Sequence, residues 1–533
     1  MDIKLLDCTL RDGGFVNDWE FGNSTIKYVT QRLIKSGMDI VEIGLLDQRR
    51  VFDMNRTIFP DTDSMNKVFG EVDKGDATIV AMIDYGTCDV ENICPKEETF
   101  IDGIRIIFKK PNMYKAIEYG KQLMDKGYFV TLQLVSITSY EDRDILDFCE
   151  AANKIHPYGV AIVDTYGLMH KEQVGHYFAL LNHNLEEGVA IGYHSHNNFQ
   201  LAYANTIELL DMKTDRTIIL DGSAYGIGKS AGNAPIELLA MHLNDCYGKN
   251  YDMNQLLEII DTSIMPIYNR TPWGYALLYY LAASNNCHPN YISYLLGKST
   301  LSVKSINKIV KEIEEDKKLN YDEKHIKELY RNYQNQKFDD ESAITELKQK
   351  YQGKDILLLA PGQTISSEHD KIQAYMDAND VEVIAVNFIP EKFKIDGMFV
   401  GNSKRYGMMT DQIMNLKEKP CMVATSNVSS LNRDFDYIVN TERVIDSAED
   451  IVDNSTAMVL NLLYILDVAS VTLAGFDGYD MNSITDSYCD ECFNLSDDFG
   501  RLQRVNTQIT QKIAEMKDEM HITFLTASQY EGK

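Results

Sequence analysis

The amino-acid sequence predicts an α/β protein with two folded domains, an N-terminal TIM (β/α)8 barrel with a helical extension and a C-terminal Rossmann-like α/β domain. The chain has 533 residues, more than one hydrophobic core usually supports. Short apolar runs alternate with amphipathic stretches in the first half, and a second such series follows a strongly charged segment. We therefore expect a barrel in residues 1–285, a helical extension and linker in 286–353, and a second domain in 354–533.

Eight apolar runs in the first part of the chain have the length and composition of buried parallel strands. Eight is also the number of strands that closes a TIM barrel, whose active site lies at the carboxyl ends of the strands. Polar residues fall at several of these ends, although an aspartate there also caps the following helix. The eight predicted strands are residues 3–7, 40–45, 77–84, 103–108, 129–135, 160–164, 189–194 and 217–221.

The sequence becomes helical and highly charged after residue 279, as in the run 310–318, which is typical of a solvated helix face. Beyond Gly353 a second series of strands begins, and its first member ends in the turn Pro361-Gly362. A three-layer Rossmann-like sheet accounts for this series most economically. The predicted strands are residues 355–362, 381–388, 398–401, 422–425, 437–440, 470–475 and 522–526.

The charge balance limits the partners of the chain. It carries 80 acidic and 52 basic residues, a formal net charge of -28, which opposes binding to nucleic acid or to an anionic membrane surface. We therefore expect small-molecule substrates, and any anionic substrate must meet local positive charge. No apolar run approaches the roughly 20 residues of a membrane span, and a strand follows Met1 directly, so we expect a cytoplasmic protein.

Nine cysteines are scattered along the chain, without the dense spacing of a secreted disulfide scaffold, and reduced thiols are expected. Cys489 and Cys492 form the one close pair. A single such pair supplies only half of a tetrahedral zinc shell. We interpret it as an inert surface pair.

Two histidines stand two residues apart at the end of a predicted strand, His194 and His196. A period of two sends both imidazoles to the same side, where they can share one metal ion. Asp12, after the first strand, can complete a three-ligand set with open positions for substrate. The pair alone is equally compatible with hydrogen-bonded polar residues. Arg11 beside Asp12 could stabilise an enolate oxygen, or it could only form an ion pair that closes the barrel.

Five segments, in order and spacing, carry a resemblance to a known family over roughly the first 285 residues. The chain resembles the DRE-TIM metallolyases, the HMG-CoA lyase-like superfamily, and within it the 4-hydroxy-2-oxovalerate aldolase-like proteins. The segments are residues 6–14, 41–44, 163–167, 192–198 and 222–233.

The resemblance implies a metal-dependent carbon-carbon lyase, here an aldolase that joins or releases a 2-oxo acid, pyruvate above all, and an aldehyde. It implies Asp12, His194 and His196 as ligands of Mn²⁺ or Mg²⁺, with Asn233 as a further ligand found in some members. Arg11 matches the arginine that steadies the enolate. A homo-oligomer, a dimer, is the commonest state expected of such enzymes.

One departure from the family concerns the base. Related pyruvate aldolases carry a histidine where this chain has Phe15. The base is therefore left open between Glu42, Asp164, Tyr166 and a metal-bound hydroxide, each of which could lie at the barrel mouth.

Two other functions compete with the aldolase. One is a Claisen-type synthase or an acyl-CoA lyase of the same superfamily, although the sequence has no recognisable acyl-CoA feature. The other is a bifunctional protein whose C-terminal domain is a nucleotide-sugar-binding transferase, because the turn at residues 360–366 stands where such sheets bind phosphates. A scaffold or dimerisation role for that domain is the simpler interpretation.

Overall fold

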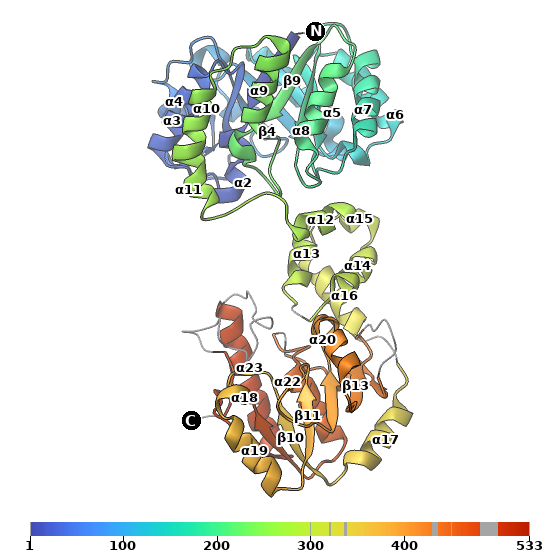
Figure 1. Ribbon diagram of the computed structural model, residues 1–533. Helices are drawn as coiled ribbons and strands as arrows, with labels where there is room; N and C mark the ends of the chain where they lie inside the picture. Colours follow the sequence, from blue (N-terminus) through green and yellow to red (C-terminus); the bar gives the residue numbers. More distant parts are fainter. Residues whose placement is uncertain are drawn as a thin grey trace. The chain divides into compact units, whose positions relative to one another are not determined.

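The computed structural model describes residues 2–298, 300–318, 321–334, 338–428, 435–448, 450–479 and 499–531. The chain divides into two compact units, Met1–Pro289 and Asn290–Lys533, which are described separately (Figure 1). Cys489 and Cys492 lie outside the described residues.

The first unit is a closed barrel of eight parallel strands, as predicted. The sheet closes because β1 pairs with both β9 and β2, and a short strand β3 (Ile58–Phe59) adds to β2. Each predicted strand end lies within one residue of the observed one. The barrel strands are β1 (Asp2–Asp7), β2 (Ile40–Leu46), β4 (Thr78–Asp84), β5 (Gly103–Phe108), β6 (Phe129–Leu134), β7 (Gly159–Asp164), β8 (Ala190–Ser195) and β9 (Thr217–Gly222).

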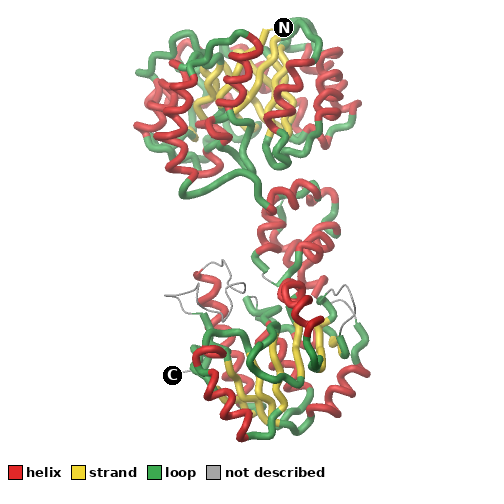
Figure 2. The backbone as a smooth tube through the Cα atoms, in the orientation of Figure 1, coloured by secondary structure: helices red, strands yellow, loops and turns green. Residues whose placement is uncertain are grey.

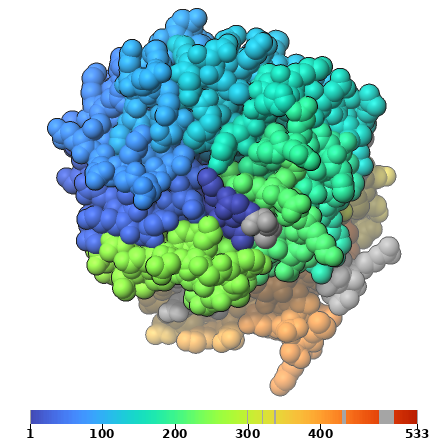
Figure 3. Space-filling model, turned by 90° about the horizontal axis from the view of Figure 1, so that it is seen from above, coloured from blue at the N-terminus to red at the C-terminus, as the bar shows by residue number. Residues whose placement is uncertain are grey.

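Helices enclose the barrel on its outside (Figure 2). In helix α3, for example, Ile26, Val29 and Leu33 recur at helical spacing and are buried against the barrel. Seen end on, the segments follow one another around the barrel from blue to green (Figure 3), because consecutive strands are neighbours. The enclosing helices are α3 (Asn23–Lys35), α4 (Thr62–Phe69), α5 (Met113–Asp125), α6 (Asp142–Asn153), α7 (Lys171–Asn184), α8 (Ala202–Glu208), α9 (Ile236–Tyr247), α10 (Met253–Ile259) and α11 (Met265–Tyr268).

The second unit contains a seven-stranded parallel sheet in the order β14-β13-β12-β11-β10-β15-β16. The order reverses direction between β10 and β15, as in Rossmann-like sheets. This confirms a second α/β domain. Its strands are β10 (Asp355–Leu359), β11 (Glu382–Val386), β12 (Gly397–Val400), β13 (Cys421–Thr425), β14 (Tyr437–Val439), β15 (Ser470–Ala474) and β16 (His521–Phe524).

Apolar side chains of β10 alternate between two cores, one on each face of this sheet. Ile356 and Leu358 join the core with helices α17 (Glu341–Tyr351), α22 (Ser455–Ile465) and α23 (Phe499–Lys517). Leu357 and Leu359 join the core with α19 (His369–Ala378) and α20 (Ser403–Asn415). Both faces are covered, so the strand is apolar throughout, which is why it reads as a continuous hydrophobic run.

Helices α12 (Leu277–Ser284), α13 (Pro289–Leu296), α14 (Val303–Lys311), α15 (Glu315–Lys318) and α16 (Glu323–Gln334) occupy the predicted helical region. Buried Asp453, just before α22, ties part of this region to the α/β part of the second unit, since it accepts hydrogen bonds from the Tyr330 hydroxyl at 2.6 Å and from Thr300. Asp340 accepts from the Asn440 backbone at 2.7 Å in the same way. None of the described helices is both long and apolar enough to cross a bilayer.

Replacing Tyr330 by Phe removes one of the hydrogen bonds to the buried Asp453 carboxylate. We expect the second unit to lose about 1–3 kcal/mol of unfolding free energy, because a buried charge is left with fewer partners. Calorimetric unfolding measures the loss. The control is Tyr464→Phe, since Tyr464 is 48% exposed, and it should change stability by less than about 0.5 kcal/mol. Equal effects of the two substitutions would contradict the role given to Asp453.

Candidate metal centre

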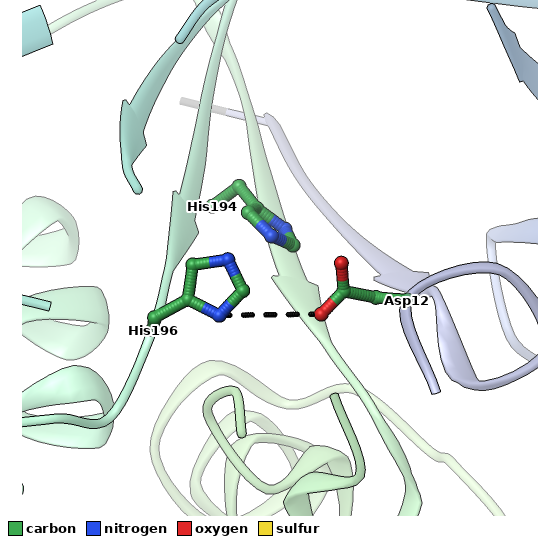
Figure 4. Close-up of side chains that lie close together, drawn as sticks. All are labelled: Asp12, His194 and His196. Carbon is green, nitrogen blue, oxygen red and sulfur yellow. Dashed lines mark ion pairs between the residues drawn. The ribbon is translucent and has the colours of Figure 1, made fainter. Parts of the chain in front are cut away.

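Three side chains that can ligate a metal converge at the carboxyl end of the barrel. One ligand atom from each of Asp12, His194 and His196 lies within 4.8 Å of the others, and all three residues are buried. The His196 Nδ1 atom is 4.0 Å from Asp12 Oδ2, and the two imidazole centroids are 5.1 Å apart (Figure 4). The histidines project from the end of β8 to the same side, as the spacing predicts.

The turn after β1 brings Asp12 to this position. The buried Asp7 carboxylate accepts hydrogen bonds from the Thr9 backbone at 2.9 Å and from the Thr9 hydroxyl at 2.7 Å. The chain therefore turns at once into the short helix α1 (Thr9–Asp12). The Trp19 indole donates to the Arg11 carbonyl at 2.8 Å, and its ring lies where a side chain at Gly14 would have to go. Hydrogen bonds within this turn therefore fix the position of Asp12.

A chain of buried charges connects one ligand to another through the barrel interior. Arg11 contacts Asp12 at 2.5 Å and Glu42 at 2.7 Å, and Arg105 contacts Glu42 at 3.1 Å. Arg105 also pairs with Asp221, whose Oδ2 lies 3.0 Å from His194 Nδ1. In order, the chain is Asp12, Arg11, Glu42, Arg105, Asp221 and His194.

Asp221 sets the orientation of His194. Its carboxylate accepts the proton on Nδ1, which leaves Nε2 with a lone pair, the usual arrangement behind a metal-ligating imidazole. Burial raises the pKa of Asp221, but the Arg105 guanidinium and His194 lower it further, so the net pKa lies below its usual value. The carboxylate therefore stays ionised and keeps His194 in place.

Buried polar atoms at the site fit a divalent cation, and this observation does not depend on the family resemblance. Among the residues that the structure describes, the buried atoms His196 Nδ1 and Asn233 Oδ1 have no hydrogen-bond partner. Buried polar atoms are nearly always paired, so two such atoms beside a carboxylate indicate a ligand. Burial lowers the pKa of His196 to about 3, which keeps its ring neutral and able to coordinate. Burial raises the pKa of Asp12, but the Arg11 guanidinium outweighs it, so the pKa lies below its usual value and the carboxylate stays ionised.

The glycine-rich loop after β9 brings Asn233 into the group. A backbone bridge joins His196 to Asn233, and the Asn233 amide donates to Asp12 Oδ2 at 2.8 Å. A Cβ atom at Gly228 would overlap both Asp12 and Asn233. The glycine is needed there because the loop backbone closes directly over the ligand atoms.

The candidate bases lie in three different surroundings. Glu42 is fully buried, and its Oε2 contacts Arg11 and Arg105. Asp164 pairs in register with Ser195 on β8, and the Ser195 hydroxyl faces α8. The Asp164 carboxylate accepts hydrogen bonds from the Leu168 and Met169 backbones at 3.0 and 3.1 Å. This carboxylate caps the turn after β7, and burial raises its pKa to about 6.

Tyr166 is half-buried, and its phenol interacts with Ser136. The structure thus brings Glu42 into the ligand group through Arg11, but it does not join Asp164 or Tyr166 to the ligands by a hydrogen bond among the described side chains. Phe15 is 46% exposed at the rim, with its ring edge against Trp19.

Sequence reasoning missed Arg105 as part of the site. Its signal was present, because an arginine between isoleucines in the middle of a buried strand needs buried carboxylate partners. Asp221 was visible only as a polar strand end, and its role depends on a contact across the barrel.

The barrel unit is similar in sequence to known proteins. Residues 2–262 match the HMGL-like family. The barrel unit is an HMGL-like domain. It is 25% identical over 280 residues to an oxaloacetate decarboxylase of Mycobacterium tuberculosis, covering 51% of this chain and 79% of that protein. It is 26% identical over 293 residues to a 4-hydroxy-2-oxovalerate aldolase of Roseiflexus sp., covering 52% and 83%. The HMG-CoA lyase structure of Bacillus subtilis matches with a TM-score of 0.40 at 18% identity, covering 51% and 94%.

Substitutions at the HMGL-like domain's metal centre should change Mn²⁺ affinity in a graded way. His194→Ala should abolish binding, and Asp221→Asn should weaken it about 10–100-fold, because the imidazole loses its orienting carboxylate. Titration calorimetry with Mn²⁺ measures both. Asp142→Asn is a matched control, since Asp142 also contacts a histidine, His176, at 2.8 Å, but on the exposed surface. Unchanged Mn²⁺ affinity in a folded His194→Ala protein would refute the site.

We expect the unfolding free energy of the HMGL-like domain to depend on pH because of Asp7. Burial raises the pKa of Asp7 from 3.8 to about 7, with the Thr9 hydrogen bonds opposing this. Between about pH 4 and pH 7 the folded HMGL-like domain then binds a proton that the unfolded chain does not. Its stability is fully present at low pH and falls as pH rises through 7, by at most about 1.4 kcal/mol per pH unit.

Asp7→Asn should remove this slope, because the amide cannot ionise and its oxygen can still accept from Thr9. Denaturant unfolding at pH 4, 5.5 and 7.5 measures the difference between the two proteins. Parallel profiles for variant and wild type would show that Asp7 does not titrate in this window.

Proposed function

We propose that the HMGL-like domain is a divalent-metal-dependent aldolase that forms or cleaves the bond between the enolate of a 2-oxo acid, pyruvate above all, and an aldehyde. One observation carries the proposal. Ligand atoms of His196 and Asn233 lie in the same buried group as Arg11 Nη2, and none of these atoms has a hydrogen-bond partner in the described part of the chain. A cation and a guanidinium at one point suit an oxygen that acquires negative charge.

In this proposal Asp12, His194, His196 and Asn233 hold Mn²⁺ or Mg²⁺. The bound cation supplies Lewis-acid polarisation of the ketone oxygen of the 2-oxo acid. Two imidazoles among the ligands favour Mn²⁺ over Mg²⁺, which prefers oxygen donors and retained waters.

Arg11 donates its free Nη2 proton to the developing enolate oxygen. Glu42 and Asp12 already hold the guanidinium at 2.7 and 2.5 Å, so it needs no rearrangement when the charge appears. Glu42 acts here as a positioning residue, because its Oε2 atom contacts both the Arg11 and the Arg105 guanidinium and holds Arg11 in place.

In the synthetic direction a base removes a proton from C3 of the 2-oxo acid, C3 bonds to the aldehyde carbon, and the aldehyde oxygen takes up a proton. Tyr166 is the protein's own remaining candidate for the base, because the Asp164 carboxylate lies on the outward face with Ser195 and caps the turn after β7. Tyr166→Phe should stop proton exchange and leave Mn²⁺ binding intact, whereas Asp164→Asn should not slow the exchange.

The proposal is tested by exchange of the methyl protons of pyruvate in D2O, followed by NMR, with Mn²⁺-loaded protein. Arg11→Lys should slow exchange about 100-fold or more, because the ammonium does not reproduce the guanidinium contact, while Mn²⁺ affinity changes little. The control Arg143→Lys alters a residue exposed on α6 and should have no effect. Absence of exchange in the metal-loaded wild type would overturn the proposal.

Product analysis then separates the related reactions. Pyruvate with aldehydes should give 4-hydroxy-2-oxo acids, whereas a product from pyruvate and acetyl-CoA would indicate a Claisen-type synthase instead.

Decarboxylation of an oxaloacetate-like acid is the second candidate. It gives the same enolate by loss of CO₂, and the enolate is then protonated at C3, so no base is needed to remove a proton from carbon. Two observations favour it: the similarity to an oxaloacetate decarboxylase, and Phe15 in place of the histidine base of related aldolases. Release of CO₂ from oxaloacetate faster than any aldol product forms would select this reaction.

A further inference from the structure

The barrel mouth carries local positive charge in a protein whose net charge is -28. Cationic side chains from three separate loops, Lys109, Arg49 and Lys229, act electrostatically on Asp84 at the carboxyl end of β4, and of these Arg49 is also ion-paired with Asp47 at 2.6 Å. Lys109 directly follows β5, and Lys229 lies on the glycine-rich loop after β9. The protein as a whole is acidic and repels anions. Cationic side chains at the carboxyl end of the barrel can locally attract an anionic substrate.

Lys229 lies closest to the metal centre among these cations. Its backbone N–H donates to Asp12 Oδ2 at 3.1 Å, which fixes the residue beside a metal ligand. Its ammonium lies 5.6 Å from the centroid of the Phe15 ring, which is exposed at the rim. The Lys229 backbone thus contacts Asp12, and its ammonium lies over the exposed Phe15 ring.

The Lys229 ammonium has no carboxylate within ion-pairing distance among the residues that the structure describes. Asp84 and Asp12 influence it only at longer range. A lysine that served only to balance buried carboxylates would be drawn into direct contact with one of them, as Lys74 is with Asp102 at 2.9 Å. Lys229 is instead supported by an aromatic face, which stabilises a cation and leaves its N–H groups for another acceptor.

We propose that Lys229 binds a second anionic group of the substrate, a carboxylate or a phosphate carried by the aldehyde. This inference rests on the proposed aldolase function and names the class of its acceptor. The metal centre and Arg11 bind the 2-oxo acid. Lys229, whose backbone N–H contacts Asp12, binds the anionic end of the aldehyde. The Phe15 ring supports the ammonium from one side.

The kinetic test compares matched aldehydes that differ in charge. The pairs are D-glyceraldehyde 3-phosphate with D-glyceraldehyde, and succinic semialdehyde with butyraldehyde, each with pyruvate and Mn²⁺-loaded protein. In the wild type the charged member of at least one pair should have the higher kcat/KM, and the pair that shows this distinguishes phosphate from carboxylate.

Lys229→Gln should lower the charged-to-neutral ratio of kcat/KM about 10–100-fold, the loss of one charge-assisted hydrogen bond. The matched control is Lys121→Gln, which makes the same change on the exposed side of α5 and should leave the ratio unchanged. A ratio that Lys229→Gln does not move would overturn the inference, and so would a wild type without preference for either charged aldehyde.

A binding measurement without turnover keeps this inference separate from the aldolase itself. Titration calorimetry of Mn²⁺-loaded protein with inorganic phosphate and with succinate should show binding that Lys229→Gln weakens about 10–100-fold and Lys121→Gln does not. If the wild type neither exchanges pyruvate protons nor makes any aldol product, the proposed function fails, and the calorimetry still decides whether Lys229 binds an anion. Equal binding by wild type and Lys229→Gln would refute the anion site.

Discussion

Burial of charge inside the barrel is the constraint on which the site depends. Three carboxylates, Asp12, Glu42 and Asp221, face two guanidiniums, Arg11 and Arg105, in a space closed to water. Taking an ion out of water costs several kcal/mol, and such a group persists only when every charge finds a partner. One negative charge is left in excess, and the neutral imidazole of His196 beside it does not cancel it. A divalent cation would make the centre positive, which suits the carboxylate of a 2-oxo acid.

The ion chain also couples the metal ligands to closure of the barrel. Its members come from five different strands or strand ends. Asp12 follows β1, Asp221 lies on β9, and these two strands are paired along their whole length. A shift of β9 relative to its neighbours would separate Asp221 from Arg105 on β5 and from His194 on β8. A site built on strand ends of a closed sheet is more rigid than one built on loops. This rigidity is the reason that Arg11 can act without rearrangement.

Much of the barrel and of the ligand set follows from the sequence because it depends on local spacing. Strand runs and the separation of His194 and His196 are local, and each was predicted. Asp164 shows where this reasoning stops: a carboxylate at a strand end faces inward or outward according to the register with the next strand, and sequence spacing does not contain that register. The partners of Arg105 and the closeness of Lys229 to Phe15 likewise depend on contacts across the barrel.

In the second unit, too, the strand order does not determine what the strand ends bind. Its strand order reverses between β10 and β15, where Rossmann-like sheets bind phosphates. At that turn, however, Asp477 accepts hydrogen bonds from the Thr364 backbone at 2.8 Å and from the Thr364 hydroxyl, and it lies against Gly362. A carboxylate thus takes the backbone donor that a phosphate would need, and its charge would repel one. A nucleotide at this edge would have to bind through groups other than this turn, so the fold of the second unit does not by itself argue for phosphate recognition there.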